Sequence, residues 1–99
     1  MFYYVYILQS KKDGELYIGC TNNLNKRIKE HNEGLVFSTK LKKPYKIIHY
    51  EAFLNKKDAF IREKWLKTGW GKNQIKVMLG KYLMDMNPPK LSNEVYIIN

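Results

Sequence analysis

The segment between residues 2 and 20 constrains the fold most, because it has the pattern of a β-hairpin. Residues 2–8 read FYYVYIL and residues 16–20 read LYIGC. Both runs are rich in the aromatic and β-branched residues that favour strands. The Asp13-Gly14 pair between them is typical of a two-residue hairpin turn. The sequence therefore predicts that the chain begins with two antiparallel strands.

The length of this turn decides which side chains of the hairpin share a face. With two turn residues, Ser10 lies opposite Tyr17, and Tyr6 then shares a sheet face with Tyr17. The two phenols are offset by roughly 13 Å along the strand, so they must lean together to act jointly. Because tyrosines on strands are also common packing residues, the pair belongs either to the core or to a site.

A helix is expected after the hairpin. Asn23 can cap its first turn, Leu24 and Ile28 are spaced i, i+4, and Gly34 suits the position just past a helix end. The helix then has about three turns.

A third strand and two helices are expected in the second half of the chain. Residues 45–50 read YKIIHY, which predicts the strand. Asn55 can cap a helix from residue 56 to about residue 68, which Gly69 and Gly71 end. A further amphipathic helix carries apolar residues at helical spacing, namely Ile75, Met78, Leu79 and Tyr82.

A chain of 99 residues suffices for one domain, which we expect at residues 1–84, with residues 85–99 as a tail of unknown role. Pro88-Pro89 must end the last helix. Residues 95–98 read VYII and can add a strand, pack on the domain or reach a partner protein. The sequence does not choose among these roles.

Charge and cysteine content indicate the kind of partner and the compartment. The chain has 18 basic and 9 acidic residues, a formal net charge of +9. Such an excess favours a polyanion such as nucleic acid, although it can also serve solubility alone. The single cysteine, Cys20, cannot close an intramolecular disulfide and suits the reducing cytoplasm. No apolar run approaches the roughly 18 to 20 residues that cross a bilayer, so we expect a cytoplasmic protein without a membrane partner.

One predicted loop concentrates the positive charge. No acidic residue lies between Gly34 and Tyr50. Lysines that contact backbone phosphates supply most of the affinity for nucleic acid, so this loop is the best candidate for such contacts. Its lysines are Lys40, Lys42, Lys43 and, at the start of the next strand, Lys46.

Two side chains of the first predicted helix are candidates for contact with a phosphate. Arg27 and His31 are spaced i, i+4 beside the apolar pair, near the edge of the surface that the helix buries. Only two of the 18 basic residues are arginines, so a retained guanidinium suggests that a bidentate fork is needed. The alternative for His31 is a surface position near the helix C-terminus, where the helix dipole tolerates a cation.

Glu63 is out of place on the next predicted helix. At 100° per residue it falls between Ala59 and Phe60, in the apolar stripe. A carboxylate buried there without a partner is costly, so it needs a cation or a metal ion. A hard divalent ion accepts one carboxylate together with water and phosphate oxygens. The alternative is a salt bridge to Lys67, one turn further along.

Several motifs in this order resemble the GIY-YIG nuclease superfamily. They are YVY at residues 4–6, YIG at 17–19, NLNKRIKEHN at 23–32, the basic loop at 38–44 and AFIREKWLK at 59–67. The resemblance extends to about Leu83. It is closest to the small stand-alone bacterial proteins that are similar to the nuclease domain of the excinuclease C subunit.

The resemblance implies an α/β chain of the α+β type, with a three-stranded antiparallel sheet flanked by helices. It also implies hydrolysis of a phosphodiester bond with one Mg²⁺ or Mn²⁺ ion. By this analogy Tyr6 or Tyr17 acts as the general base or orients the attacking water. Arg27 clamps the phosphate, His31 assists proton transfer or contacts the phosphate, and Glu63 holds the metal ion.

Three positions depart from the family pattern. Tyr4 stands where the family name has Gly, and Cys20 stands where excinuclease-type members carry a lysine. A loop lysine such as Lys40 can substitute for the latter. Asn73 is only a candidate for the family's late asparagine.

Two classes of function follow. The leading hypothesis is a magnesium-dependent endonuclease that cuts DNA, with a role in DNA repair or recombination. The alternative is a nucleic-acid-binding module of the same fold that lacks turnover or depends on a protein partner. The tail or the region of Trp70 would contact such a partner.

Overall fold

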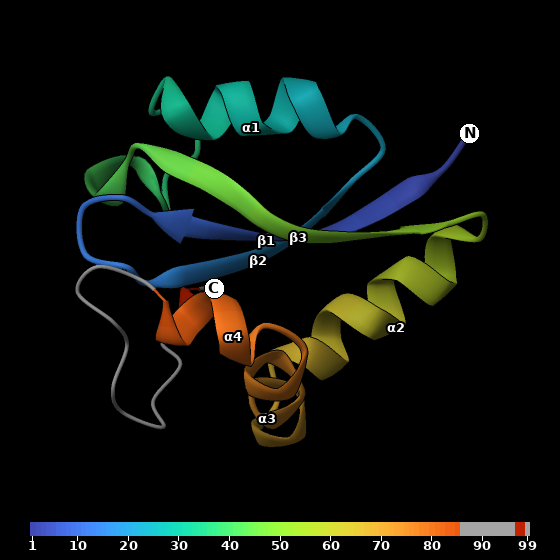
Figure 1. Cartoon of the computed structure of the whole chain (residues 1–99). Coiled ribbons are helices and arrows are strands. Elements are labelled where there is room, and N and C mark those ends of the chain that lie inside the picture. The colour runs from blue at the N-terminus through green and yellow to red at the C-terminus, as the bar shows by residue number, and fades with distance from the viewer. Residues whose placement is uncertain (86–96, 99) are drawn as a thin grey trace.

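A four-stranded sheet forms the centre of the computed structural model, which describes residues 1–85 and 97–98 (Figure 1). The strands lie in the order β3-β1-β2-β4. The central strand β1 (Tyr3–Ser10) pairs antiparallel with β2 (Leu16–Thr21) and with β3 (Tyr45–Phe53). The short strand β4 (Ile97–Ile98) pairs in parallel with β2. The predicted three-stranded antiparallel sheet is confirmed, and two residues of the tail add a strand to its edge.

Helices cover both faces of this sheet (Figure 1). Helix α1 (Leu24–Asn32) lies on one face, which we call the α1 face. The other helices lie on the opposite face, which we call the α2 face. They are α2 (Lys56–Leu66), α3 (Gly69–Met78) and α4 (Gly80–Met84). A short 3-10 helix, η1 (Lys40–Lys42), lies in the chain just before β3.

The predicted helix caps are confirmed. The Asn23 side chain accepts a hydrogen bond from the backbone N–H of Lys26, and the Asn55 side chain accepts from those of Lys57 and Asp58. Gly34 follows α1 with a φ of 78°, the left-handed conformation that a glycine adopts without strain.

The two glycines after α2 have another role than the predicted one. Gly69 begins α3, because Thr68 caps that helix by accepting a hydrogen bond from the N–H of Gly71. A Cβ at Gly71 would lie 2.3 Å from the carbonyl oxygen of Trp65, so this glycine lets α3 approach α2 closely.

The last predicted helix is divided in two. Helix α3 ends at Met78, and α4 begins at Gly80 after a non-helical Leu79 with φ −115° and ψ 15°. Glycine is among the poorest helix formers, which favours a break at this point. The predicted helix stop at Pro88-Pro89 lies outside the described residues.

The hairpin turn is longer than predicted. Ser10 donates its N–H to the carbonyl of Glu15, and Tyr6 lies opposite Gly19, so residues 11–14 form a four-residue loop. The Ser10 hydroxyl oxygen accepts hydrogen bonds from backbone N–H groups inside this loop. The pairing therefore shifts by two residues without a change of face. Tyr6 and Tyr17 share a face as predicted, and their offset is half the predicted value.

The two faces of the sheet bury different side chains. The core on the α2 face is aliphatic and consists of Val5, Ile7, Leu16, Ile18, Ala59, Leu66 and Ile75. The core on the α1 face consists of Tyr6, Leu8 and Tyr45, with Tyr17, Leu24, Ile28 and Ile47 packed against it. Phenols are thus concentrated on the face that α1 covers.

Candidate active site

A buried chain of hydrogen bonds crosses the α1 face. The Tyr6 hydroxyl lies 2.9 Å from Nε2 of His31, and Nδ1 of His31 lies 2.7 Å from the Thr39 hydroxyl. All three side chains are at most 1% exposed. His31 comes from α1, Tyr6 from β1 and Thr39 from the loop before η1, so the fold brings three segments together at one imidazole. The alternative that His31 lies on the surface is wrong.

Gly19 makes room for Tyr6. A Cβ at this position would lie 2.3 Å from the Tyr6 hydroxyl oxygen. Because Gly19 is the residue opposite Tyr6 in the β1–β2 pair, the phenol ring passes directly over it. The glycine of the YIG triplet is therefore required by packing.

Two further phenol rings surround His31. The ring centroid of Tyr17 lies 4.9 Å from that of His31 and 6.3 Å from that of Tyr6. The Tyr45 centroid lies 6.1 Å from that of His31. The buried hydroxyl of Tyr45 has no hydrogen-bond partner among the described residues.

Arg27 lies beside this chain at the protein surface. Its side chain is 37% exposed, and one guanidinium nitrogen lies 3.3 Å from the Glu30 carboxylate. Burial raises the pKa of Tyr6, and the neighbouring charge of Tyr17 adds to this effect, whereas the guanidinium of Arg27 opposes it. Tyr6 is therefore a neutral phenol in the protein as it stands.

Burial also keeps His31 neutral. It lowers the pKa of the imidazole to about 4, and the nearby positive charge of Arg27 contributes to this shift. At neutral pH the ring therefore carries one proton, and one of its two nitrogens can accept a hydrogen bond.

Glu63 on α2 is half-buried and acts on the same cluster. Its side chain is 17% exposed, and its carboxylate lies 3.5 Å from Nζ of Lys67, so the predicted salt bridge is present. Its negative charge also contributes to the raised pKa values of Tyr6 and of the Cys20 thiol. Among residues 1–85 and 97–98, no group of three or more His, Cys, Asp or Glu side chains could hold a metal ion. Within these residues, Glu63 therefore belongs to no multi-residue metal cluster.

A pocket of about 300 Å³ opens where Arg27 reaches the surface. It lies between the end of β2 and α1, and Cys20 and Glu30 also line it. The guanidinium is accessible to an anion from this side.

The lysines of the basic loop differ in their contacts. Nζ of Lys42 lies 2.5 Å from the Glu15 carboxylate and 2.9 Å from that of Asp13, so Lys42 fastens this loop to the β1–β2 loop. The hydrogen bond to Glu15 raises the pKa of Lys42. Lys40 and Lys43 make no ion pair with the described part of the chain, and the Lys40 ammonium lies 4.9 Å from the ring centroid of Phe37.

Some of the relevant residues differ from those that the sequence indicated. Asn73 is exposed on α3 and makes no hydrogen bond to the cluster. Conversely, Thr39 and Tyr45 belong to the cluster, and no sequence pattern pointed to either of them. Only their places next to the basic loop and at the start of a strand could have drawn attention to them.

The fold and the cluster together define a class of protein. This is a small α+β domain in which a tyrosine–histidine chain and an accessible arginine lie on the α1 side of the sheet, and a half-buried carboxylate on α2 acts on Tyr6 through its charge. The chain belongs to the GIY-YIG nuclease family, since the family model described as the GIY-YIG catalytic domain matches residues 2–76. The resemblance seen in the sequence motifs is thus confirmed.

The relatives are small bacterial proteins, as expected. The chain is 40% identical over 91 residues to a UPF0213 protein of Clostridium perfringens, which covers 91% of this chain and 97% of the relative. It is also 40% identical over 73 residues to a UPF0213 protein of Bacillus licheniformis, covering 73% of this chain and 74% of the relative.

A solved structure supports the fold. The solution NMR structure of a UPF0213 protein from Bacillus halodurans matches with a TM-score of 0.52 and 34% identity. The match covers 93% of this chain and 98% of that chain. In the described part of this chain, none of the helices has the length and apolar character that crossing a membrane requires.

Proposed function

We propose that the protein is a magnesium-dependent endonuclease that hydrolyses DNA phosphodiester bonds. The observation that carries the proposal is the buried chain from Thr39 through His31 to Tyr6, whose phenol lies near the accessible guanidinium of Arg27. Buried polar groups are costly in a small core unless every member is satisfied. A chain of this kind, next to a cation that can bind phosphate, is suited to moving a proton.

The hydrogen bonds favour one direction of proton transfer. The Thr39 hydroxyl lies 3.4 Å from the Val36 carbonyl and can donate to it, which leaves the hydroxyl oxygen to accept the Nδ1–H of His31. Nε2 of His31 then accepts the hydrogen bond of the Tyr6 hydroxyl. As Tyr6 Oη takes a proton from the attacking water, its own proton passes to Nε2. The water oxygen bonds to phosphorus, and the bond from phosphorus to the leaving oxygen breaks. The leaving oxygen keeps the electron pair and takes a proton from solvent, and His31 later returns its extra proton to solvent.

Arg27 supports this reaction in two ways. Its guanidinium favours the phenolate form of Tyr6, as its opposition to the raised pKa indicates. Its planar fork can also bind two phosphate oxygens and stabilise the negative charge that develops on them.

Glu63 is the residue that would hold the metal ion. Magnesium accepts a single protein carboxylate together with water and substrate phosphate oxygens, so a lone half-buried carboxylate fits it, and Mn²⁺ fits the same ligands. When bound, the ion supplies charge stabilisation and lowers the pKa of its bound water. If Glu63 bound a metal ion, the salt bridge between its carboxylate and Lys67 would have to break.

The charge supports a nucleic-acid substrate. Lys42 is held by two carboxylates, whereas Lys40 and Lys43 form no ion pair within residues 1–85 and 97–98 and can contact backbone phosphates. The net charge of +9 has the sign that nucleic acid requires. A cytoplasmic location and a role in DNA repair or recombination complete the proposal.

A cleavage assay with Mg²⁺ tests this function. Supercoiled plasmid and a branched duplex are incubated with the wild type, with Glu63→Gln and with the matched control Glu33→Gln. Glu33 is an exposed carboxylate at the end of α1, and its ion pair in the described part of the chain is with Lys29. We expect the wild type and Glu33→Gln to cut at the same rate and Glu63→Gln to be about 100-fold slower or worse. Equal rates in all three proteins would remove the assignment.

The second candidate function is a nucleic-acid-binding module that turns over only with a partner, or not at all. Two observations favour it. The raised pKa of Tyr6 makes the phenol a poor base, and the Glu63 carboxylate already forms a salt bridge with Lys67. Salt-dependent binding without cleavage of linear, nicked, flapped or RNA substrates would support this module. Cleavage by the protein alone would exclude it.

A further inference from the structure

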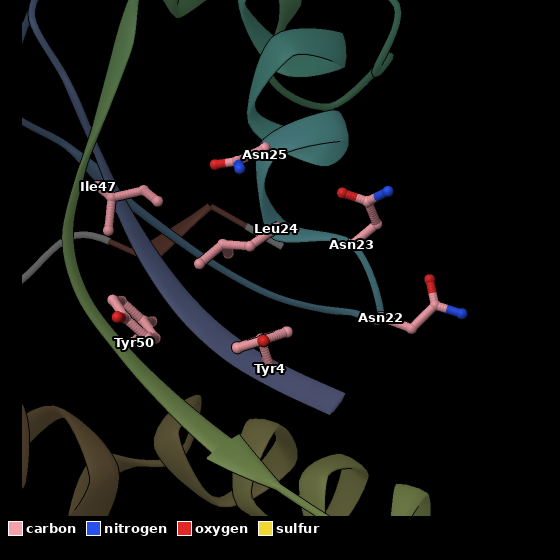
Figure 2. A pocket seen from close by; sticks show the side chains of 7 residues that line it. All are labelled: Tyr4, Asn22, Asn23, Leu24, Asn25, Ile47 and Tyr50. Atoms are coloured by element: carbon pink, nitrogen blue, oxygen red, sulfur yellow. The ribbon is translucent and has the colours of Figure 1, made fainter. Parts of the chain in front are cut away.

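A second hollow, of about 440 Å³, lies on the α1 face next to the proposed active site (Figure 2). Two tyrosines, Leu24, Ile47 and the asparagines at the start of α1 line it. Its volume is within the range of small-molecule sites, and none of the described residues that line it is charged. The hollow therefore suits a flat, neutral, polar-edged group better than a phosphate.

The two tyrosines provide a surface for stacking. The rings of Tyr4 and Tyr50 meet edge to face, with centroids 6.0 Å apart and an interplanar angle of 63°. Tyr50 is 55% exposed, so part of its ring is open to a ligand. It lies opposite Tyr6 in the β1–β3 pair, which places it on the same face as the proposed general base. Exposed aromatic rings of this kind are where unpaired bases stack in single-stranded nucleic acid complexes.

Asn25 provides a polar group at the other side of the hollow. Its side chain projects from α1 above Ile47, whereas Asn22 and Asn23 point away from the rings (Figure 2). The Asn25 amide makes no hydrogen bond to the described residues. An amide offers a donor and an acceptor side by side, which matches the edge of a nucleobase.

The hollow adjoins the pocket of Arg27. Asn22 and Asn23 line both of them. A nucleotide can therefore place its base against Tyr50 while a neighbouring phosphate lies at the guanidinium. Tyr4, which replaces the glycine of the family name, forms one side of the hollow.

We infer that this hollow holds one unpaired DNA base beside the phosphate that is cut. The inference rests on the proposed function and deepens it, because it makes the preferred substrate a DNA with unpaired nucleotides, such as a flap or an overhang. Duplex without such nucleotides fills only the phosphate pocket.

A binding experiment without divalent ions tests the inference separately from catalysis. Fluorescence anisotropy compares a duplex bearing a short single-stranded flap with the same duplex whose flap nucleotides are abasic, so that charge and length are equal. The proteins are the wild type, Tyr50→Ala, Tyr50→Phe and the control Trp70→Ala, which removes another exposed aromatic side chain, on α3. Thermal melting confirms that each variant is folded.

The wild type is expected to bind the flap with bases about tenfold more tightly than the abasic flap. Tyr50→Ala should abolish this difference and leave affinity for the abasic flap unchanged, whereas Tyr50→Phe and Trp70→Ala should keep it. Equal wild-type affinities for the two flaps, or an equal loss for both in Tyr50→Ala, would overturn the inference. An RNA flap bound tenfold more tightly than DNA would overturn the choice of DNA. Because no cleavage is needed, a failure here leaves the Mg²⁺ assay to judge the nuclease proposal.

Discussion

The two faces of the sheet have different chemistry although they share every strand. On the α2 face, the buried side chains of β1 and β2 are Val5, Ile7, Leu16 and Ile18. On the α1 face, the same two strands present Tyr6 and Tyr17 to His31. The core on the α2 face is aliphatic, whereas the tyrosines and the buried histidine are gathered on the α1 face.

The two arginines also differ, since Arg62 on α2 forms contacts within the protein and Arg27 on α1 reaches the surface. Arg62 binds the Glu51 carboxylate with two hydrogen bonds, of 2.8 and 3.0 Å, and so fastens α2 to β3. Arg27 makes one longer contact, of 3.3 Å, with Glu30 and reaches the surface. The bidentate fork that the scarcity of arginine suggested is therefore formed at Arg62 within the protein. At Arg27 it remains available for a phosphate.

Alanine substitutions at the two arginines should have the largest effects and test whether Arg27 serves cleavage and Arg62 serves stability. We expect Arg27→Ala to lower the cleavage rate about 100- to 1,000-fold, because it removes the charge that faces the transition state. Arg62→Ala should cleave normally at 25 °C but lose about 2 kcal/mol of unfolding free energy, because Glu51 loses both hydrogen bonds from Arg62 and keeps its contact with His49. Rates and urea unfolding of both variants provide the check. If Arg27→Ala cleaved at the wild-type rate but lost unfolding free energy, Arg27 would have a structural role and the assignment would be wrong.

Acid should weaken the α1 face before the α2 face. His31 has its pKa lowered to about 4, so the unfolded chain binds a proton that the folded protein does not between pH 6.5 and about pH 4. Stability therefore falls as the pH drops through this window, by about 3 kcal/mol in total, and His31 adds no further loss below it.

Urea unfolding at a series of pH values measures this effect. The variant His31→Asn serves as the comparison, since it cannot titrate and should lack this part of the pH dependence. If wild type and variant lose the same free energy between pH 6.5 and pH 4.5, the imidazole is not held neutral by the α1 face.

Gly19→Ala tests how tightly the Tyr6 ring is packed. The added Cβ would meet the Tyr6 hydroxyl, so we expect a loss of about 1–3 kcal/mol in unfolding free energy and a slower cleavage rate. Gly80→Ala is the matched control, because a Cβ there meets no atom within 4 Å. Calorimetry should show destabilisation for the first variant alone. Similar melting temperatures for Gly19→Ala and the wild type would contradict the close approach.

The smallest expected effect belongs to Thr39. Thr39→Val removes the hydroxyl that bonds Nδ1 of His31 and should slow cleavage about tenfold by releasing the imidazole from one orientation. Thr39→Ser should restore the rate. The acid limb of the pH–rate profile should shift in Thr39→Val and return in Thr39→Ser, whereas identical profiles would assign Thr39 a packing role only.

Local signals in the sequence predicted the elements and the shared face of Tyr6 and Tyr17. Alternation along the strands determines the face, and capping residues such as Asn23 and Asn55 determine the helix starts. The turn length was wrong because the Ser10 hydroxyl and the Lys42 ion pairs stabilise a longer loop than Asp13-Gly14 alone indicates. Such contacts join segments that are distant in the chain.

The candidate site was predicted only in part for the same reason. Tyr6, Arg27 and His31 lie in motifs, and the structure brings them together. Thr39 reaches His31 only because the loop folds back over α1, and a hydroxyl in a basic loop carries no signal of this. The break at Leu79 was missed because apolar spacing continues across it and outweighed the low helix propensity of Gly80 in the prediction.

The substitution Tyr6→Phe tests the central claim most directly, because it removes one oxygen atom from the buried chain and leaves the ring over Gly19. Single-turnover cleavage of a flapped DNA by the wild type and the variant, with Mg²⁺ at neutral pH and saturating protein, is the measurement. The account predicts a rate at least about 100-fold lower for the variant, with an affinity for DNA equal to that of the wild type. A variant that cuts within about threefold of the wild-type rate would contradict it.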